Sequence, residues 1–355
     1  KALRPLPEKW HGLRDVDLRY RQRYLDLISN EDIKKVFRAR SSIIKKIRDF
    51  LDAKGFLEVE TPMMHSIARG AAGRPFKTFH NEYSMDLYLR IAPELYLKEL
   101  LVGGFDRIYE INRSFRNEGV STRHNPEFTM LEIYQAYSDF EGMMQLAEDL
   151  IVGLVQNINN GTLVNYQGKA IDFSPPWKRV SFAEMVNEKF GITPADDENV
   201  MLGKLKAKGF AKEVNKLSRT QIAKIIEEVL EEGMSLNPTF VTDYFTVMCP
   251  LAKTREDNRL ISQRFELYIA GMEVGNAYSE LNDPIEQRAR FEEEIKNLPT
   301  QEAKNIDDEY CLALEHGMPP AGGLGIGIDR LVMLLTDQPS IRDVILFPLL
   351  RPQQE

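Results

Sequence analysis

Cysteine is scarce in this chain. The 355 residues include only Cys249 and Cys311, which are too few for a disulfide framework or for a zinc site of their own. So few cysteines are typical of a reducing compartment, and we expect a cytoplasmic protein. The sequence also lacks an apolar run of the roughly 18 residues that span a bilayer, and it does not open with a signal peptide, so we expect no membrane association.

An excess of positive charge is missing as well. The 46 basic and 54 acidic residues give a formal net charge of -8. A general nucleic-acid binder would lean basic, so any contact with nucleic acid should use a local patch. Internal repeats and low-complexity segments are absent. With 43% hydrophobic and 28% charged residues, the composition is that of an ordinary globular enzyme.

Hydrophobic periodicity predicts the order of the elements. A long helix starts at Asp32 and ends before Gly55, and a short strand follows until Pro62. The other expected helices cover residues 92–102, 140–155 and 329–336, and the expected strands cover 106–118, 127–135, 239–245, 265–270, 273–280 and 322–328, with a small hairpin at 161–176. Regular alternation of strands and helices is missing. We therefore predict an α+β fold with a mainly antiparallel sheet flanked by helices.

Changes in composition divide the chain into four regions. Residues 1–25 are basic and contain two prolines, as a linker does, and the first residue is Lys1 rather than Met, so we expect the natural protein to begin further upstream. Residues 26–179 and 237–355 carry the strand patterns and form the expected core. Residues 180–236 are rich in Lys and Glu and poor in aromatic residues, which predicts an inserted helical subdomain.

One predicted hairpin carries an unusual set of polar side chains. Side chains two residues apart in a strand share a face, so one face here should be polar. Such groups rarely line the same sheet face unless a ligand satisfies them, and a guanidinium suits negative charge that develops on phosphorus. The alternative is an exposed ion pair beside a core phenylalanine. The residues concerned are Arg116, Glu118, His124, Asn125, Phe128, Glu132 and Tyr134.

A second polar strand lies near the end of the chain. Asn276, Tyr278 and Glu280 share one face, whereas Glu273 has the opposite parity unless Gly275 marks a bulge. Acidic residues beside phosphates repel them unless Mg²⁺ lies between, so Glu266 and Glu273 are candidate metal ligands. The alternative is a solvated polar face.

Three carboxylates could form a site for a cation. If Glu94, Glu132 and Glu280 converge beside Tyr134 and Tyr278, the matching ligand is an ammonium group, for example on an extended aliphatic stem. The sequence does not by itself require this convergence.

Glycine alternates with apolar residues shortly before the last predicted helix. Gly323, Gly325 and Gly327 match neither the P-loop nor the dinucleotide fingerprint. They leave one strand face without side chains, and a planar base could lie on such a floor. Arg330 then opens the helix, where it could reach a phosphate or stack on the base.

Together these segments resemble the three signature motifs of class II aminoacyl-tRNA synthetases. The helix and strand that end at Pro62 resemble motif 1, residues 115–134 resemble motif 2, and residues 323–335 resemble motif 3. The lysine-specific family is the most similar, on residues 92–98, 123–128 and 275–283. This resemblance implies a class II catalytic core and a homodimer formed through motif 1. Members of that family carry an N-terminal anticodon-binding OB-fold, and nothing here corresponds to it.

The resemblance also implies a reaction and its residues. Lysine and ATP would give lysyl-adenylate, the acceptor end of tRNA(Lys) would receive the lysyl group, and Arg116 and Arg330 would be catalytic. ATP would contact Arg116, Glu118, His124, Asn125, Phe128, Glu266, Glu273 and Arg330, and Glu266 and Glu273 would hold Mg²⁺. Lysine would contact Gly70, Glu94, Arg116, Glu132, Tyr134, Asn276, Tyr278, Glu280 and Gly325.

Some positions depart from the family pattern or separate it from related families. Arg69 stands where glycine is expected, and Phe245 and Cys249 replace the usual proline and serine. The related ligase that modifies elongation factor P with β-lysine has serine at the Ala92 position and alanine at the Gly325 position. A non-catalytic regulatory paralogue would lack one of the motif arginines. Both families remain alternatives that the residues disfavour.

Overall fold

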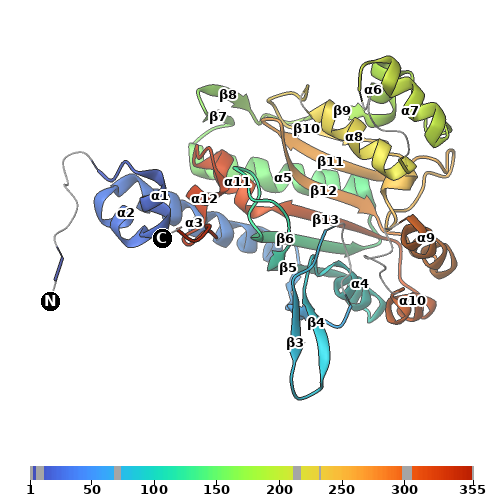
Figure 1. The fold of residues 1–355 in the computed structure, drawn as a ribbon, viewed down its shortest axis with the longest axis horizontal. Coiled ribbons are helices and arrows are strands. Elements are labelled where there is room, and N and C mark those ends of the chain that lie inside the picture. The colour runs from blue at the N-terminus through green and yellow to red at the C-terminus, as the bar shows by residue number, and fades with distance from the viewer. Residues whose placement is uncertain are drawn as a thin grey trace.

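A mostly antiparallel sheet forms the centre of the molecule (Figure 1). The computed structural model describes residues 3–4, 12–67, 73–210, 217–231, 233–297 and 306–353. In these ranges, β1 pairs parallel with β5 and β9 parallel with β10, while the other neighbours pair antiparallel. The α+β prediction is confirmed. The strand order is β1 (Leu57–Glu58), β5 (Arg107–Phe115), β6 (Glu127–Ala136), β13 (Ala321–Gly327), β12 (Met272–Ser279), β11 (Arg264–Ile269), β10 (Thr239–Thr242) and β9 (Lys178–Ser181).

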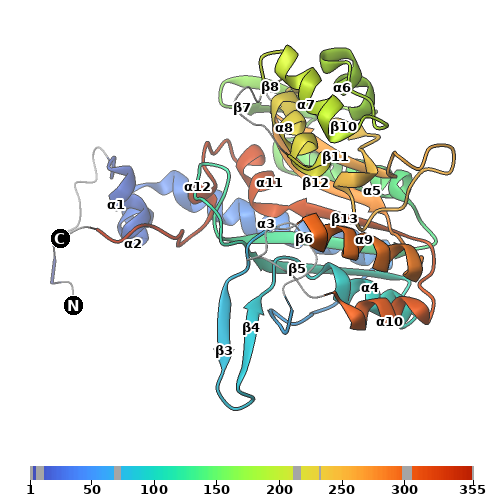
Figure 2. The same cartoon turned by 45° about the vertical axis from the view of Figure 1, so that its right-hand side comes forward.

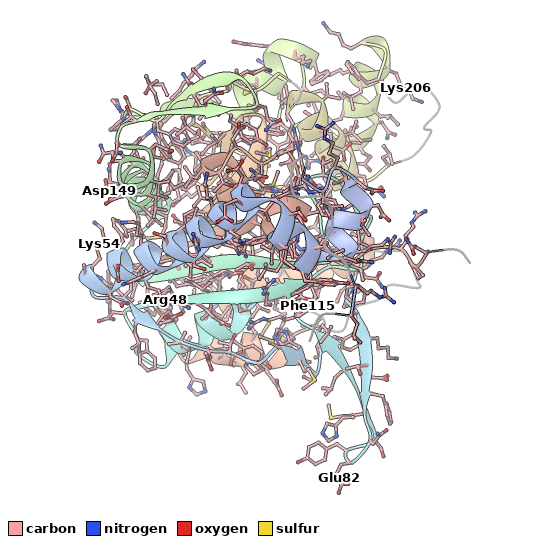
Figure 3. The ribbon with its side chains drawn as sticks, turned by 90° about the vertical axis from the view of Figure 1, so that its left-hand side faces the viewer. Arg48, Lys54, Glu82, Phe115, Asp149 and Lys206 are labelled. Atoms are coloured by element: carbon pink, nitrogen blue, oxygen red, sulfur yellow. The ribbon has the colours of Figure 1, made fainter. Side chains whose placement is uncertain are left out.

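Two smaller sheets lie outside this one. Strands β2 (Met64–His65), β4 (Met85–Leu89) and β3 (Lys77–His80) form the first. The β3–β4 hairpin projects away from the body of the molecule, and Figure 3 shows Glu82 at its tip. Strands β7 (Leu163–Tyr166) and β8 (Lys169–Asp172) form the second, which confirms the small hairpin predicted there.

Helices α3 (Glu31–Ala53), α5 (Phe140–Asn159) and α11 (Ile328–Leu335) cover one face of the large sheet (Figure 1). In α3, Ile43, Ile47 and Leu51 follow each other at helical spacing and are fully buried, so they form one apolar stripe. This stripe belongs to the same core cluster as Leu131 of β6 and Ile326 of β13. The helix ends as predicted, because Gly55 takes the positive φ of 79° that stops it.

The opposite face of the sheet is only partly covered. Helices α4 (Glu94–Val102), α9 (Pro284–Asn297) and α10 (Asp308–Glu315) lie at one end of it (Figure 2). Pro93 precedes α4, close to its predicted start. Leu97 of α4, Tyr134 of β6 and Tyr310 of α10 share a buried cluster. This arrangement leaves the polar side chains of the central strands facing the same side as α4.

The predicted helical insertion contains α6 (Phe182–Phe190), α7 (Glu198–Ala207) and α8 (Arg219–Glu231). These helices lie together above the sheet in Figure 1. Their apolar side chains share a cluster with Val241 of β10 and with Tyr244, which precedes the short 3-10 helix η1 (Thr246–Met248). The first residues assigned to the insertion differ from the prediction, because β9 reaches Ser181 and belongs to the large sheet.

Both ends of the described chain pack together. Helices α1 (Val16–Arg21), α2 (Arg23–Ser29) and α12 (Ile341–Val344) lie on the left of Figure 1. Buried Arg23 donates to Asp26 at 2.5 Å and to the carbonyl oxygens of Arg342 and Leu346 at 2.9 and 3.0 Å. Part of the expected linker is therefore helical and packed. Within the described ranges, no helix combines the length and apolar character that a membrane span needs.

Candidate functional site

Strand register aligns the predicted polar residues in two rows across the uncovered sheet face. Residues paired across neighbouring strands point to the same side of a sheet. One row runs through Glu110, Glu132, Gly325, Asn276 and Glu266 on β5, β6, β13, β12 and β11. The next row contains Tyr134, Gly323 and Tyr278. Residues from distant parts of the chain thus meet on one face.

The acidic residues of this face surround a buried lysine. Lys98 Nζ lies 2.7 Å from Glu94 Oε1 and also forms an ion pair with Glu280. The Tyr278 hydroxyl donates to the same Glu94 oxygen at 2.8 Å. Because Lys98 bridges Glu94 and Glu280, the three side chains lie together, and we call them with Glu132 the acidic pocket.

Burial controls the charge of the acidic pocket. It raises the pKa of Glu132 to about 8, and nearby Glu94 adds to this effect. Burial likewise raises the pKa of Glu280 to about 8, although Lys98 opposes the rise. For Lys98, burial alone would lower the pKa, but Glu280 and Glu94 outweigh it, so the pKa lies above its ordinary value. The pocket therefore releases protons readily near neutral pH when a cation enters.

Sequence reasoning missed Lys98. Its signal was present, because Glu94 and Lys98 stand four residues apart on a helix whose only other charged residue is Glu99, and residues four apart face the same side. Reasoning about glycine was also incomplete. A Cβ on Gly323 would meet Tyr134 at 2.7 Å and overlap Glu280. The missing side chain at Gly323 therefore leaves space for Tyr134 and Glu280 of the acidic pocket. The surface without side chains that we expected to hold a planar base is limited to Gly325 and Gly327.

The other half of the face carries the arginine of the hairpin. Strand β5 ends at Phe115, so Arg116 lies just beyond it, although its N–H still donates to Pro126 at 2.9 Å. The Arg116 guanidinium carbon lies 5.3 Å from the centre of the Phe128 ring. Its Nε and the Oδ1 of Asn125 are buried without a hydrogen-bond partner among the described residues. Buried polar atoms of this kind fit a site that a ligand completes.

Glu118 lies close to this arginine. A Cβ on Gly73 would approach Glu118 Oε1 at 3.2 Å and Arg116 Cδ at 3.4 Å, so both side chains flank the same glycine. The sequence predicts that Arg116 and Glu118 project together from a strand. Their side chains do lie near each other, but both residues belong to the loop after β5.

His124, Arg330 and Glu273 form a connected group near Arg116. The Arg330 Nη2 lies 3.2 Å from His124 Nε2, and its Nη1 donates to the carbonyl oxygen of Glu273 at 2.5 Å. Burial and the positive charge of Arg330 lower the pKa of His124, so the imidazole is neutral at pH 7. A neutral ring beside an arginine can accept or donate a hydrogen bond without repelling a phosphate.

Glu266 and Glu273 meet because of a β-bulge. Leu267 pairs with Gly275 but Tyr268 pairs with Glu273, so Val274 is the extra residue of β12. This bulge brings Glu273 to the face that carries Glu266, as the sequence allowed.

The carboxylates of Glu266 and Glu273 differ in their hydrogen-bond partners and in their exposure. Tyr244 and Tyr268 donate to Glu266 Oε2 at 2.8 and 2.7 Å, and Arg264 pairs with Oε1. Glu273 is partly exposed, with Arg330 3.5 Å away. The described residues contain no group of three or more metal-binding side chains. A pair of carboxylates still fits Mg²⁺, which is commonly held by one or two carboxylates together with substrate phosphates.

Helix α8 of the insertion adds two carboxylates that sequence reasoning did not identify. The Tyr268 hydroxyl, which donates to Glu266, lies 3.1 Å from Glu231 Oε1. Burial and the charge of Glu266 raise the pKa of Glu227 to about 8. These two carboxylates can be assigned to the site only from the contact between α8 and β11, because the local sequence of α8 does not indicate that contact.

Almost all residues predicted for the site lie on this face or in the loop beside it. Gly70, expected in a covering loop, lies outside the described residues, as does Arg69. Gly325 lies in the first row, between Glu132 and Asn276. The face combines the acidic pocket with a cationic region, because Arg116 lies over Phe128 and Phe128 shares a face of β6 with Glu132.

Comparisons with known proteins bear on this face. Residues 15–351 match the family described as class II tRNA synthetases (D, K and N). A lysine–tRNA ligase of Carboxydothermus hydrogenoformans is 56% identical over 99% of this chain and 73% of its own length. One of Pelotomaculum thermopropionicum is 55% identical over all of the chain and 71% of its length, and one of Clostridium perfringens is 50% identical over all of the chain and 72% of its length.

Proposed function

The chain belongs to the class II tRNA synthetases of the D, K and N group, and we propose which of its residues carry out the reaction. It activates L-lysine with ATP and charges tRNA(Lys), as its relatives across the whole chain do. One observation carries the assignment of the site. The acidic pocket and the Arg116 region occupy neighbouring positions on the same sheet face, so one ligand can be cationic at one end and anionic at the other.

Lysine binds in the acidic pocket. Glu94, Glu132 and Glu280 face its ammonium groups, and Tyr134 and Tyr278 orient these carboxylates through the hydrogen bonds to Glu132 and Glu94. Asn276 and Gly325 lie beside the pocket in the same row as Glu132. Gly70, which lies outside the described residues, is a further proposed lysine contact. The lysine carboxylate then points toward Arg116.

ATP binds on the arginine side. Phe128 lies under the adenine, Glu118 and Asn125 contact its edge, and the buried Asn125 Oδ1 is free to accept from the base. Arg330 covers the opposite face, and His124 lies near the outer phosphates. Arg116 contacts the α-phosphate, where its unpartnered Nε becomes satisfied.

The chemistry follows from this placement. A lysine carboxylate oxygen attacks the α-phosphorus, a new phosphorus–oxygen bond forms, and the bond to the β-phosphate oxygen breaks to release pyrophosphate. No general base is needed, because the carboxylate is already ionised. Arg116 neutralises charge that develops at phosphorus. The rest of the rate enhancement comes from holding the lysine carboxylate in line with the α-phosphorus. The terminal ribose hydroxyl of tRNA then attacks the carbonyl carbon, and AMP leaves.

Magnesium fits beside this reaction centre. Glu273 would hold it together with Glu266, whose Oε1 would exchange its contact with Arg264 for the metal, and phosphate oxygens of ATP would be further ligands. Bound there, it would supply positive charge to the phosphates, which the two carboxylates would otherwise repel.

We propose that the protein is a cytoplasmic homodimer formed through α3, β1 and the segment after them. Exposed apolar side chains support this, because Leu57, Met63 and Met64 are about half exposed in the single chain, at 49%, 49% and 53%. Figure 3 shows α3, with Arg48 and Lys54, along one side of the molecule. Sedimentation of the purified protein tests this directly, and a monomer at micromolar concentration would contradict it.

Adenylate formation tests the proposed function. We expect ATP–pyrophosphate exchange that depends on L-lysine and Mg²⁺, with little exchange on β-lysine. A preference for β-lysine would point instead to the ligase that modifies elongation factor P, and exchange at background with either amino acid would point to a regulatory paralogue.

A further inference from the structure

Lys98 is buried at the centre of the acidic pocket. Its side chain is 0% exposed, and it joins Glu94 on its own helix to Glu280 at the end of β12. Removing an ammonium group from water is costly, and an apolar side chain of the same length would fill the space without that cost. Packing alone therefore does not explain a lysine at this position.

The charges of the pocket suggest what Lys98 does. When Glu94, Glu132 and Glu280 are all ionised, Lys98 balances one of them and leaves two negative charges. Free lysine carries two ammonium groups, while its carboxylate has Arg116 as a partner. The pocket with Lys98 therefore matches lysine in charge, whereas the pocket without it would keep one unbalanced carboxylate, which burial disfavours.

We propose that Lys98 is a positioning residue that sets the specificity of the pocket: it holds Glu94 and Glu280 in place and fixes the net charge that a substrate with two ammonium groups neutralises. The inference rests on the proposed function, because it takes the acidic pocket as the lysine site. Lys98 acts through the two carboxylates and not on the reacting atoms.

Other charged and titratable groups face these three residues. Burial raises the pKa of each neighbouring phenol, so near neutral pH the carboxylates are the groups that titrate. Tyr310 of α10 has no hydrogen-bond partner for its hydroxyl among the described residues. Among the residues that the structure describes, these groups are Tyr134 and Glu132 on β6, Tyr278 on β12, Tyr310 on α10, and the Arg90–Glu110 ion pair beside Glu132.

Lys98→Met in the full chain tests the proposal. Methionine keeps an unbranched stem of similar length and removes the charge. We expect the KM for L-lysine in pyrophosphate exchange to rise by at least about tenfold at about pH 7, with a smaller change in kcat. Because Glu280 loses its neighbouring cation, its pKa rises. In a plot of KM against pH, the midpoint of the fall in KM should therefore move to higher pH by at least about one unit. A merely structural defect would raise the KM equally at every pH.

A charge-restoring double variant sharpens the test. In the wild type, the ionised pocket has a net charge of minus two. Glu280→Gln alone reduces this to minus one, whereas Glu280→Gln together with Lys98→Met restores minus two. We therefore expect the double variant to bind lysine more tightly than Glu280→Gln alone. This comparison also applies if Lys98→Met does not fold, because the double variant keeps the net charge of minus two that the wild-type pocket has, whereas Lys98→Met alone has minus three.

Lys35→Met is the matched control, since Lys35 forms an exposed i,i+3 pair with Asp32 and should leave the KM unchanged. If the wild type shows no exchange with lysine, the proposed function fails. If the wild type is active but Lys98→Met keeps the wild-type KM and pH profile, or the double variant is no tighter than Glu280→Gln, the role of Lys98 is wrong and the proposed function stands.

Discussion

Buried polar atoms without partners distinguish several residues of the site. Arg116 Nε, Asn125 Oδ1 and Glu280 Oε1 are all buried and accept or donate no hydrogen bond among the described residues. An unsatisfied buried polar atom costs about 1–3 kcal/mol, so a fold keeps it where a ligand repays the cost on binding. These unsatisfied atoms, which would face the proposed substrates, therefore lower the free energy of unfolding of the unliganded molecule.

Arg116→Ala tests the arginine that would contact the α-phosphate. We expect the rate of lysine adenylation to fall by at least about a hundredfold, because the guanidinium stabilises charge that develops in the transition state. Single-turnover formation of lysyl-adenylate measures this. Arg113→Ala, near the end of β5, is the control, because the Arg113 side chain forms an exposed pair with Glu127 at 3.6 Å. A near-normal rate for Arg116→Ala would refute the role.

Gly323→Ala tests whether the room at this glycine serves the acidic pocket. The added Cβ would meet the Tyr134 ring at 2.7 Å and overlap the Glu280 carboxylate, so Glu280 has to move. We expect a raised lysine KM and a loss of about 1–3 kcal/mol in the free energy of unfolding, as overpacking causes. Gly153→Ala in α5 is the control, since nothing lies within 4 Å of its added Cβ. Unchanged lysine binding in Gly323→Ala would argue against this reading.

At the scale of elements, a buried ion pair fixes α11 against α3 and β6. Arg40 of α3 lies 2.5 Å from Asp329, and Asp329 also accepts from the backbone N–H of Thr129 at 2.7 Å. Asp329 directly precedes Arg330, so this contact holds the first turn of α11, which carries Arg330. The expected motif 1 helix is thereby linked to the ATP side of the site.

Arg40→Met should show this link. It leaves Asp329 buried without its cation, which costs about 3–5 kcal/mol of folding free energy, and it should also raise the KM for ATP. Arg48→Met on the same helix removes an exposed pair with Glu58 and should cost under about 1 kcal/mol with no change in the KM. Chemical denaturation and pyrophosphate exchange supply both readouts. Equal effects of the two variants would contradict the link.

At the scale of the whole molecule, the acidic pocket makes stability depend on pH and on lysine. Glu132 and Glu280 have a pKa of about 8 in the folded chain, well above the roughly 4.3 of an unfolded glutamate. Their contribution to stability is therefore complete below about pH 4.3 and is lost as the pH rises through about 8. A cation that pairs with the ionised carboxylates restores it.

We expect the rise in melting temperature caused by lysine to be larger at about pH 8.5 than at about pH 6, because more of the pocket carboxylates are ionised there. Glu132→Gln should reduce this difference. Glu82→Gln, at the exposed tip of the β3–β4 hairpin, should not alter it (Figure 3). A lysine effect that is independent of pH in the wild type would mean that the pocket is already ionised.

Much of this arrangement could be predicted from periodicity. The stripe of Ile43, Ile47 and Leu51 predicts α3, and the alternating polar residues of β6 predict a face with Glu132 and Tyr134. The local pattern extended the first hairpin strand too far, because the strand ends where its partner β6 begins, at the pair Phe115 and Glu127. Register across separate strands is a tertiary property, and local patterns do not contain it.

The sequence by itself determined which residues are candidates for the site and what kind of ligand they suit, because residue type and parity depend only on the local chain. Tertiary structure decided which of these groups are already paired. It placed Lys98 between Glu94 and Glu280, surrounded Glu266 with donors, and brought Glu231 of α8 next to Tyr268 of β11. Such pairing depends on residues that are far apart in the sequence, and burial then sets how strongly their charges interact.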